Sequence, residues 1–433
     1  MIEAEGKTSH WWQRIPLYLQ IAIALILAVS VGILLGGGNP AAGNIALINN
    51  LAIPCDLVLK ILRALATPLI LLAVVHTFLT ANIPGTAGRR LFILLLTNTT
   101  VAILIGLLVA NILQPGKWGQ IRAPEGSAEN IKNLDPWALL QNMVPSSVVE
   151  PLVNNNVLQI IVIALSFGIV LRALKKEQVA SNKINYEALE WVIGTLFDAV
   201  VRILEWVIAL VPLAVFGIVA KTVALEGFTP FKSLGALIIA VLVALFLQAC
   251  YYLLRVKIGS WVNPLQFLIG GFDAFMTAFS TSSSTVTMPI TFRVLQEKIG
   301  LRESSASLGA LVGSNFNNDG TALYEAMAAL FIAQVLNRNL DLLQQLIVVL
   351  TSVFASVGAA GIPNAGLVTM TLVFSSVGLP TQYIALLITV DWFLDRCRTA
   401  INVMGDMTVS ALLDGKQKKP DVEIIGSKSD QLE

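Results

Sequence analysis

The chain has 433 residues, of which 56% are hydrophobic and only 13% are charged, and its formal net charge is +1. This composition is too apolar for a soluble protein of this length and is typical of a polytopic membrane protein. The balanced charge, without a basic run that carries interleaved aromatic residues, argues against nucleic-acid binding, and the presence of only 2 histidines argues against a histidine-based metal site.

Six apolar segments in the first 260 residues are long enough to cross a bilayer. They span residues 17–36, 51–79, 91–113, 157–174, 192–219 and 234–254. Basic residues at Arg14, Arg89, Lys175 and Arg255 fall at alternate ends of these segments. Because basic loops stay in the cytoplasm, we expect a multi-pass protein of the plasma (inner) membrane with a cytoplasmic amino terminus.

The pattern changes after residue 264, where small or polar residues interrupt every apolar segment. Irregular backbone at membrane depth is tolerated only inside protein or along an aqueous cavity, and broken helices offer carbonyls to cations and amides to anions. We therefore expect a scaffold half (1–257) and a substrate-handling half (258–413). A polar cytoplasmic tail follows (414–433).

A run of hydroxyl residues at 280–285 lies at a break between two short apolar arms. Its hydroxyls and successive backbone amides favour a bound carboxylate, although a flexible turn would carry the same residues. No lysine or histidine accompanies the run at the spacing that a serine nucleophile needs. The sequence therefore does not predict an enzyme.

Residues 317–321 place side-chain oxygens beside a glycine-loosened backbone, and hard cations prefer oxygen ligands. Asp319 would supply one negative charge to a sodium-like ion. If helix resumes after this break, Thr321 and Glu325 share a face. Glu325 is then an ionisable group buried in the membrane, and it either carries a proton or pairs with a buried arginine such as Arg396.

A glycine-rich stretch at 356–366 contains Pro363 and lies between the apolar flanks 346–355 and 367–377. Glycines let the backbone kink and move, and each flank is too short to span a bilayer comfortably. We expect the mobile tip of a re-entrant hairpin here, with a plain interhelix loop as the alternative.

The last apolar segment carries a polar stripe. At about 100° per residue its polar members fall within an arc of about 80° on one helix face; they are Asp391, Asp395, Arg398, Asn402 and Asp406. Each charge near a bilayer centre costs about 2.5–3.5 kcal/mol, so the stripe indicates a binding function. The alternatives are a cytoplasmic helix and a structural ladder of ion pairs.

The charges of this stripe suit an acidic α-amino acid, which has two carboxylates and one amine. Arg398 can hold a carboxylate through two parallel hydrogen bonds, and Asp395, one turn earlier, can receive the ammonium group. Asp406 could face Asn317 on the neighbouring broken helix and serve as a second cation ligand.

Four of these segments closely resemble the dicarboxylate/amino acid:cation symporter family, the glutamate transporters. The segments are 281–289 (TSSSTVTMP), 317–321 (NNDGT, where the family has Asn-Met-Asp-Gly-Thr), 355–370 and 391–399 (DWFLDRCRT). The last helix is most similar to the animal excitatory and neutral amino acid transporters. The resemblance implies an all-α membrane protein of glutamate-transporter fold, with eight transmembrane helices plus two re-entrant helical hairpins. It also implies a homotrimer whose subunits each carry their own site across the bilayer by an elevator mechanism.

The resemblance also implies the site residues. Substrate would contact Ser283, Ser284, Thr321, Ile362, Gly366, Asp395, Arg398, Thr399 and Asn402. A first sodium site would use Asp406 with the carbonyls of Gly313, Asn317 and Asn402. A second sodium site would use the carbonyls of Asn315, Ser356, Val357 and Ala359. A third sodium site would use Asn98, Thr99, Asn317 and Asp319. Glu325 matches the glutamate that couples protons in the animal acidic transporters.

Three positions depart from the family pattern. Leu95 stands where a tyrosine is expected near the third sodium site, Asn98 stands where a threonine is usual, and Asn318 replaces the motif methionine. A carboxamide can still ligate sodium, so the site could be rebuilt. The sodium stoichiometry is therefore left open by the sequence.

We expect a secondary active symporter of acidic amino acids, driven by sodium, with proton co-transport and potassium counter-transport as open additions. The alternative within the family is a carrier of neutral amino acids or C4-dicarboxylates, and outside it a membrane-embedded enzyme or a channel. Arg398 argues against neutral substrates and Asp395 against dicarboxylates without an amine. No cofactor is expected beyond the coupling ions, and the sequence does not separate aspartate from glutamate.

Overall fold

The computed structural model describes residues 15–80, 85–119, 144–154, 157–359 and 365–418, and every element in these ranges is helical. The helices of the first half are α1 (Leu17–Leu35), α2 (Ile45–Asn50), α3 (Ile53–Thr80), α4 (Gly85–Leu113), α6 (Glu150–Asn154), α7 (Val157–Ala180), α8 (Asn185–Ile208), α9 (Val211–Glu226) and α10 (Thr229–Gly259). Those of the second half are α11 (Pro264–Thr281), α12 (Ser284–Val294), α13 (Glu303–Ser307), α14 (Gly313–Phe316), α15 (Asp319–Val335), α16 (Leu342–Ala359), α17 (Ala365–Ser376) and α18 (Ile384–Asp414). Short π-helical turns occupy Leu295–Ile299 and Leu308–Val312.

Four stretches among the described residues are long and apolar enough to cross a membrane. They are Leu17–Leu35, Ala42–Thr80, Gly88–Lys117 and Thr229–Gly259. A fifth crossing results if α8 and α9, which meet at a bend of 41°, form one span. These stretches coincide with five of the six segments expected from hydropathy, and α7 contains the sixth. The chain is therefore a multi-pass membrane protein in its length and composition.

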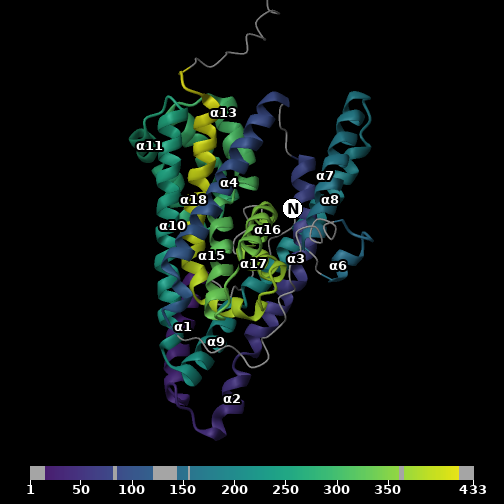
Figure 1. Cartoon of the computed structure of the whole chain (residues 1–433). Helices are drawn as coiled ribbons and strands as arrows, with labels where there is room; N and C mark the ends of the chain where they lie inside the picture. Colours follow the sequence, from purple (N-terminus) through teal and green to yellow (C-terminus); the bar gives the residue numbers. More distant parts are fainter. Residues whose placement is uncertain (1–14, 81–84, 120–143, 155–156, 360–364, 419–433) are drawn as a thin grey trace, which may run out of the picture.

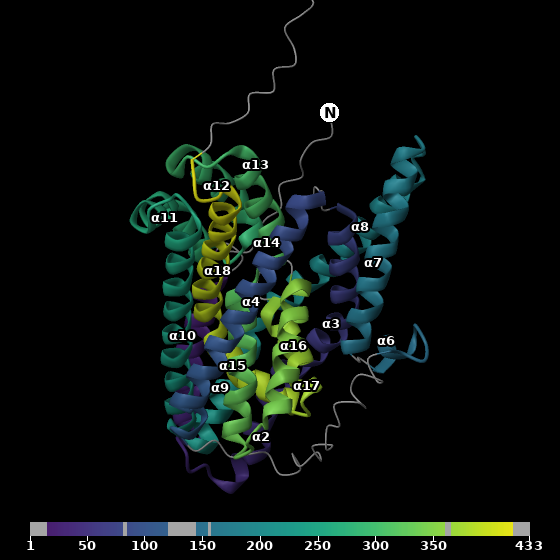
Figure 2. The ribbon, with the colours of Figure 1, turned by 45° about the horizontal axis from the view of Figure 1, so that its top comes forward.

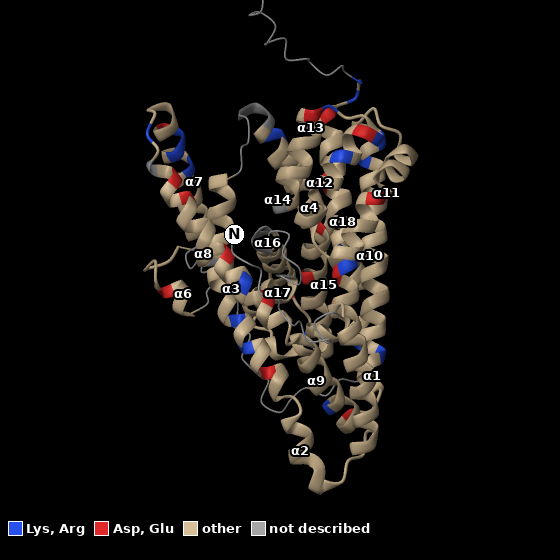
Figure 3. Ribbon diagram, turned by 180° about the vertical axis from the view of Figure 1, so that it is seen from behind, with Lys and Arg blue, Asp and Glu red and all other residues tan. Residues whose placement is uncertain are grey.

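The helices pack in a fixed order across the molecule (Figures 1 and 2). α10 and α11 lie against α18 on one side, and α4 packs on α15 beside them. The pair α16 and α17 packs against both α15 and α3, and α7 and α8 pack against α3 as well. Many charged residues lie at the end of the molecule where α7 meets α8 and where α11, α12 and α13 lie (Figure 3).

Two interruptions of the second half arise from local backbone geometry. Ser282 adopts a left-handed conformation with φ 53°, which ends α11, and the hydroxyl of Ser283 then caps α12 by accepting from the amide of Val286 at 3.2 Å. α14 ends before Asn317, whose φ of −102° and ψ of 78° are not helical, and α15 begins at Asp319. The expected breaks near 282 and 317 are thus present.

α15 is the most enclosed helix of the molecule's second half, because all 17 of its residues are buried. It packs against α4, α16, α17 and α18. Its polar side chains must therefore find partners on these neighbouring helices, since lipid and water do not reach them.

Candidate functional site

The polar stripe of α18 faces the protein interior. Asp391, Asp395, Arg398, Asn402 and Asp406 are all buried, as the helical spacing predicts. Arg396 lies off this face, stacks on the ring of Tyr18 at 4.8 Å, and is only partly buried. The stripe is therefore not a solvent-exposed surface.

Arg398 has no exposed side-chain surface and is only partly satisfied. Its Nη2 donates to Asp391 Oδ1 at 2.9 Å and to Asp395 Oδ1 at 2.8 Å. Its Nε and Nη1 have no hydrogen-bond partner among the described residues. The guanidinium lies over the ring of Tyr324, 4.2 Å from its centroid. Carboxylates thus bind one nitrogen of this buried cation, Nη2, while Nε and Nη1 stay available.

Residues from three separate helices meet close to Nη1 of Arg398. A Cβ added to Gly366, next to the start of α17, would lie 3.3 Å from Arg398 Nη1 and 3.6 Å from the methyl group of Thr321. Asn402 lies one turn further along α18, and its Nδ2 is 3.4 Å from Thr321 Oγ1. With Asp395, which bonds to Arg398, the structure therefore brings together five of the residues that the sequence assigned to substrate.

The remaining residues of that set are placed less directly. Thr399 is buried and donates to the carbonyl of Asp395 at 2.8 Å. Ser283 and Ser284 are buried at the start of α12, which packs against α18. Ile362 lies outside the described residues.

The end of α11 bonds to α18 through Arg396, a residue that the sequence assigned neither to substrate nor to cations. Arg396 Nη1 donates to the carbonyls of Phe279 at 2.9 Å and Ser280 at 2.7 Å, at the end of α11. These bonds satisfy orphan carbonyls of a helix C-terminus with a positive charge. The alternative in which Arg396 pairs with Glu325 is therefore wrong.

The residues expected for a first cation site converge on Asp406. Asn317 Nδ2 donates to Asp406 Oδ1 at 3.1 Å and to the carbonyl of Asn402 at 3.2 Å. Gly313 approaches so closely that a Cβ there would lie 2.6 Å from Asp406 Oδ1. The described residues give this buried carboxylate no cationic partner. Carboxylate, carbonyl and amide oxygens around an uncompensated buried charge fit a hard cation.

The residues expected for a second cation site come from two elements that are in contact, α14 and α16. Asn315 belongs to the backbone of α14, and Val357 and Ala359 to that of α16. The carbonyl of Ser356 accepts a hydrogen bond of 2.9 Å from Asn318 Nδ2. Asn318 thus connects this set to α18, where Asn402 Nδ2 lies 3.3 Å from its Oδ1.

The residues expected for a third cation site are occupied by donors of the chain itself. Asp319 accepts from Thr99 Oγ1 at 2.5 Å and, at its second oxygen, from the phenol of Tyr252. Arg255 Nη1 donates to Asn98 Oδ1. The sequence reasoning missed Tyr252 altogether and treated Arg255 only as a marker of orientation. The one signal for them was their spacing, which places both on one face of α10.

Glu325 lies in the middle of α15 and is completely buried. The hydroxyl of Thr369, on α17, donates to its Oε1. Its Oε2 has no partner among the described residues, and none of the ion pairs found in them includes Glu325.

A comparison with protein families agrees with these arrangements. The model described as the sodium:dicarboxylate symporter family matches residues 17–416. The chain belongs to this family. The resemblance found in the sequence is thereby confirmed, and the symporter is a membrane transporter, which fits the expectation that it is not an enzyme.

Several curated relatives of the symporter are similar over most of their length. Excitatory amino acid transporter 3 of Homo sapiens is 30% identical, over 94% of this chain and 87% of its own. Excitatory amino acid transporter 4 of Mus musculus is 31% identical, over 90% of this chain and 81% of its own. Excitatory amino acid transporter 1 of Ambystoma tigrinum is 32% identical, over 83% of this chain and 76% of its own.

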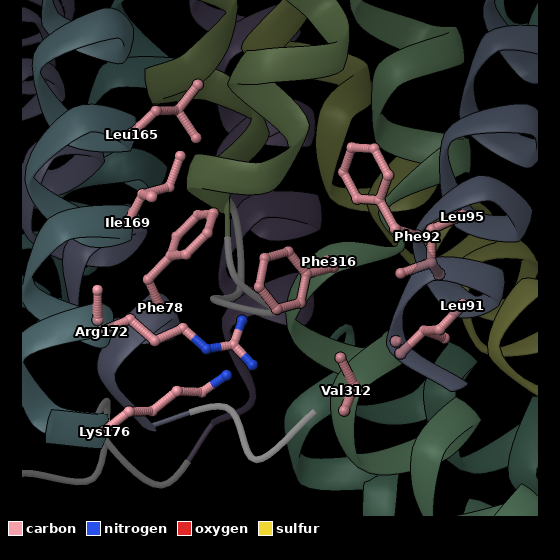
Figure 4. Close-up of a pocket in the computed structure, with 12 residues that line it drawn as sticks. Phe78, Leu91, Phe92, Leu95, Leu165, Ile169, Arg172, Lys176, Val312 and Phe316 are labelled. Carbon is pink, nitrogen blue, oxygen red and sulfur yellow. The ribbon is translucent and has the colours of Figure 1, made fainter. Parts of the chain in front are cut away.

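A cavity of about 660 Å³ lies apart from the polar site of the symporter, between α3, α4, α7 and α14 (Figure 4). Its walls are mostly apolar, and Phe78 and Phe316 meet edge to face across it at 6.3 Å. Arg172 and Lys176 reach into it from α7. Its lining includes Leu95 but none of the residues that the sequence assigned to substrate or cations.

Proposed function

We propose that this protein is a secondary active symporter that carries an acidic α-amino acid, aspartate or glutamate, together with sodium. The observation that carries the proposal is the half-satisfied guanidinium of Arg398. A fully buried arginine with two nitrogens lacking partners among the described residues is costly unless an anion completes it.

The geometry around Arg398 supports an acidic substrate. Nε and Nη1 each keep a donor without a partner among the described residues, and either can donate a charge-assisted hydrogen bond to a substrate carboxylate. Thr321 and Gly366 lie close to Nη1, and the absence of a side chain at Gly366 leaves room beside Nη1. An apolar substrate side chain would leave Nε and Nη1 without an acceptor.

The ammonium group of the substrate requires a negative partner, and Asp395 is the nearest candidate. Asp395 and Asp391 together place two carboxylates on the single guanidinium of Arg398, and this excess of negative charge would attract an ammonium group. The full proposed substrate set is Ser283, Ser284, Thr321, Ile362, Gly366, Asp395, Arg398, Thr399 and Asn402. A C4-dicarboxylate without an amine would leave Asp395 unused, which makes such a carrier the less favoured alternative.

Two cation sets support sodium coupling. Asp406 has a buried charge with one neutral donor, Asn317, and we propose a sodium ion there with carbonyls of Gly313 and Asn402. The second ion would use carbonyls of Asn315, Ser356, Val357 and Ala359. Both sets share residues or hydrogen bonds with the substrate set through Asn402 and Asn318, so an ion in either set can change the shape of the substrate site.

The proposed arrangement in the membrane has eight transmembrane helices and two re-entrant hairpins, α11–α12 and α16–α17. Residues 258–413 would form most of the moving unit, and α4 would move with it because it packs on α15. The rest of 1–257 would be the scaffold of a homotrimer, with both termini in the cytoplasm and 414–433 as a tail. The site would cross the membrane by an elevator motion.

Glu325 is the proposed proton carrier. A carboxyl group with one neutral donor and no counter-ion is accommodated in a dry interior when it carries a proton. Thr369 joins Glu325 to the second hairpin. A change in the protonation state of Glu325 can therefore alter how this hairpin, the proposed gate, packs on α15. The return of the empty site would then need another cation, for which potassium is the expected ion.

The function is tested by uptake into proteoliposomes made with the purified protein. We expect an inward sodium gradient to drive accumulation of radiolabelled aspartate, and choline in place of sodium to abolish it. Excess glutamate should compete strongly, and serine and succinate weakly. Equal competition by serine would replace the proposal with a neutral amino acid carrier, and equal competition by succinate with a dicarboxylate carrier. Uptake that is indifferent to the gradient would exclude a symporter.

A further inference from the structure

The third cation set differs from the other two because an arginine side chain donates to one of its oxygens. Both carboxylate oxygens of Asp319 are taken, one by Thr99 and one by Tyr252. The side-chain oxygen of Asn98, Oδ1, accepts a hydrogen bond from Arg255. A hard cation needs several oxygens that turn their lone pairs toward it. In this set a guanidinium bonds to Asn98 Oδ1 and brings a positive charge to the place that a cation would occupy. The residues present therefore do not fit a third sodium ion.

Asn317, the remaining member of the set, is turned toward the first cation set. Its Nδ2 donates to Asp406 and to the carbonyl of Asn402. Only its Oδ1 lacks a donor among the described residues. One amide oxygen alone does not make a sodium site.

Two of the positions that depart from the family pattern, Leu95 and Asn98, lie in or beside this cluster with Tyr252 and Arg255. Leu95 belongs to an apolar cluster with Leu91 and lines the cavity of Figure 4, so position 95 offers no hydroxyl to Asp319. Tyr252 supplies a phenol from a different helix, α10. The side-chain oxygen of Asn98 accepts a hydrogen bond from the guanidinium of Arg255.

Arg255 also brings the charge that an ion would otherwise supply. Tyr252 and Arg255 stand one turn apart on α10, and the guanidinium is held additionally over the ring of Tyr251 at 5.7 Å. A positive group close to a buried carboxylate offsets the cost of removing that charge from water. The buried Asp319 thus has its counter-charge within the same cluster.

We propose that the guanidinium of Arg255 takes the place of the third sodium ion and that Tyr252 completes the cluster without any ion. This cluster then connects α4, α10 and α15 through fixed hydrogen bonds; its members are Asn98, Thr99, Asp319, Tyr252 and Arg255. The symporter couples its substrate to the first and second cation sets alone. This inference rests on the proposed sodium-driven function but concerns only the number of ions.

The first test counts sodium ions without substrate or gradient. The melting temperature of the purified protein is followed against sodium concentration, with choline holding the ionic strength constant, and the slope reports the number of ions bound. Arg255→Met should show a slope steeper by one ion than the wild type. Arg302→Met is the matched control, since Arg302 is paired with Asp414 away from the site, and it should keep the wild-type slope. An unchanged slope in Arg255→Met contradicts the inference.

A second variant covers the case in which Arg255→Met does not fold. Asp319→Asn should leave the sodium slope at the wild-type value, because Asp319 holds no ion, and Asp319→Asn combined with Arg255→Met keeps the charges balanced and should do the same. A slope lower by one ion in either variant would make Asp319 a sodium ligand and overturn the inference.

The last test measures the coupling ratio in proteoliposomes from the sodium gradient that just balances an aspartate gradient. The wild type should move two sodium ions with each aspartate, and three would overturn the inference. If sodium drives no aspartate uptake, the proposed function fails, whereas the melting slopes still decide the role of Arg255. If sodium drives uptake but the slopes or the ratio require a third ion, only the inference about Arg255 is wrong.

Discussion

The side-chain amide of Asn318 donates to the backbone carbonyl of Ser356 over 2.9 Å, and this bond ties the start of α15 to α16. The carbonyl of Ser356 belongs to the proposed second sodium set. The asparagine that replaces the motif methionine therefore competes with an ion for one of its ligands.

Replacing Asn318 with methionine should release the carbonyl of Ser356 to sodium. Because one net hydrogen bond is worth about 1 kcal/mol, we expect the sodium concentration for half-maximal aspartate uptake to fall roughly fivefold. The measurement is a sodium titration of initial uptake rates, with Asn49→Met on an exposed residue as the control. An increase in the sodium midpoint would show that Asn318 helps the ion to bind.

Arg398→Cys should remove the selectivity for acidic substrates. The substrate carboxylate loses its paired contact, which is worth about 2–5 kcal/mol, so aspartate affinity should fall by about a hundredfold or more. Transport of serine or alanine should appear, as measured by competition and direct uptake. Arg398→Lys keeps the charge without the planar guanidinium, so its aspartate affinity should lie between those of the wild type and the cysteine variant. Unchanged aspartate affinity in the cysteine variant would remove Arg398 from the site.

Asp395→Asn should separate amino acids from dicarboxylates. The variant keeps the shape of the side chain but cannot neutralise an ammonium group, so aspartate binding should collapse while succinate is penalised far less. Asp391→Asn is the comparison, because Asp391 also pairs with Arg398 and should affect both substrates alike. Equal losses of both substrates in Asp395→Asn would make Asp395 structural.

Asp406→Asn should act on sodium before it acts on substrate. Removing the only carboxylate of the first cation set should raise the sodium midpoint by about tenfold or more, equal to about 1.4 kcal/mol. Aspartate affinity at saturating sodium should change less. Equilibrium binding at several sodium concentrations separates the two effects, and an unaltered sodium dependence would exclude Asp406 as a ligand.

Glu325→Gln should abolish the dependence of net uptake on an inward proton gradient. The amide stays neutral at every pH and still accepts from Thr369, so exchange of internal for external aspartate should survive. Thr369→Val is the companion variant, which removes the donor but keeps the titratable group and should retain the proton dependence. The same pH dependence in Glu325→Gln as in the wild type would place proton coupling elsewhere.

Much of this molecule follows from local patterns in the sequence. Hydropathy locates the apolar helices, because a bilayer demands long runs without charge. The spacing of Asp391, Arg398 and Asp406 places them on one face of α18, because helical periodicity is a local property. The breaks before Ser283 and Asp319 can be expected from polar and small residues in apolar surroundings.

Only the tertiary structure decides which polar groups satisfy one another. Tyr252 and Asp319 are 67 positions apart, and Arg255 and Asn98 are 157 apart, so no local pattern links them. Arg396 likewise bonds to the first hairpin and not to Glu325. In a dry interior buried polar groups need hydrogen-bond partners. The packing of helices that are far apart in the chain determines whether a given buried oxygen faces a side-chain donor or is left for an ion.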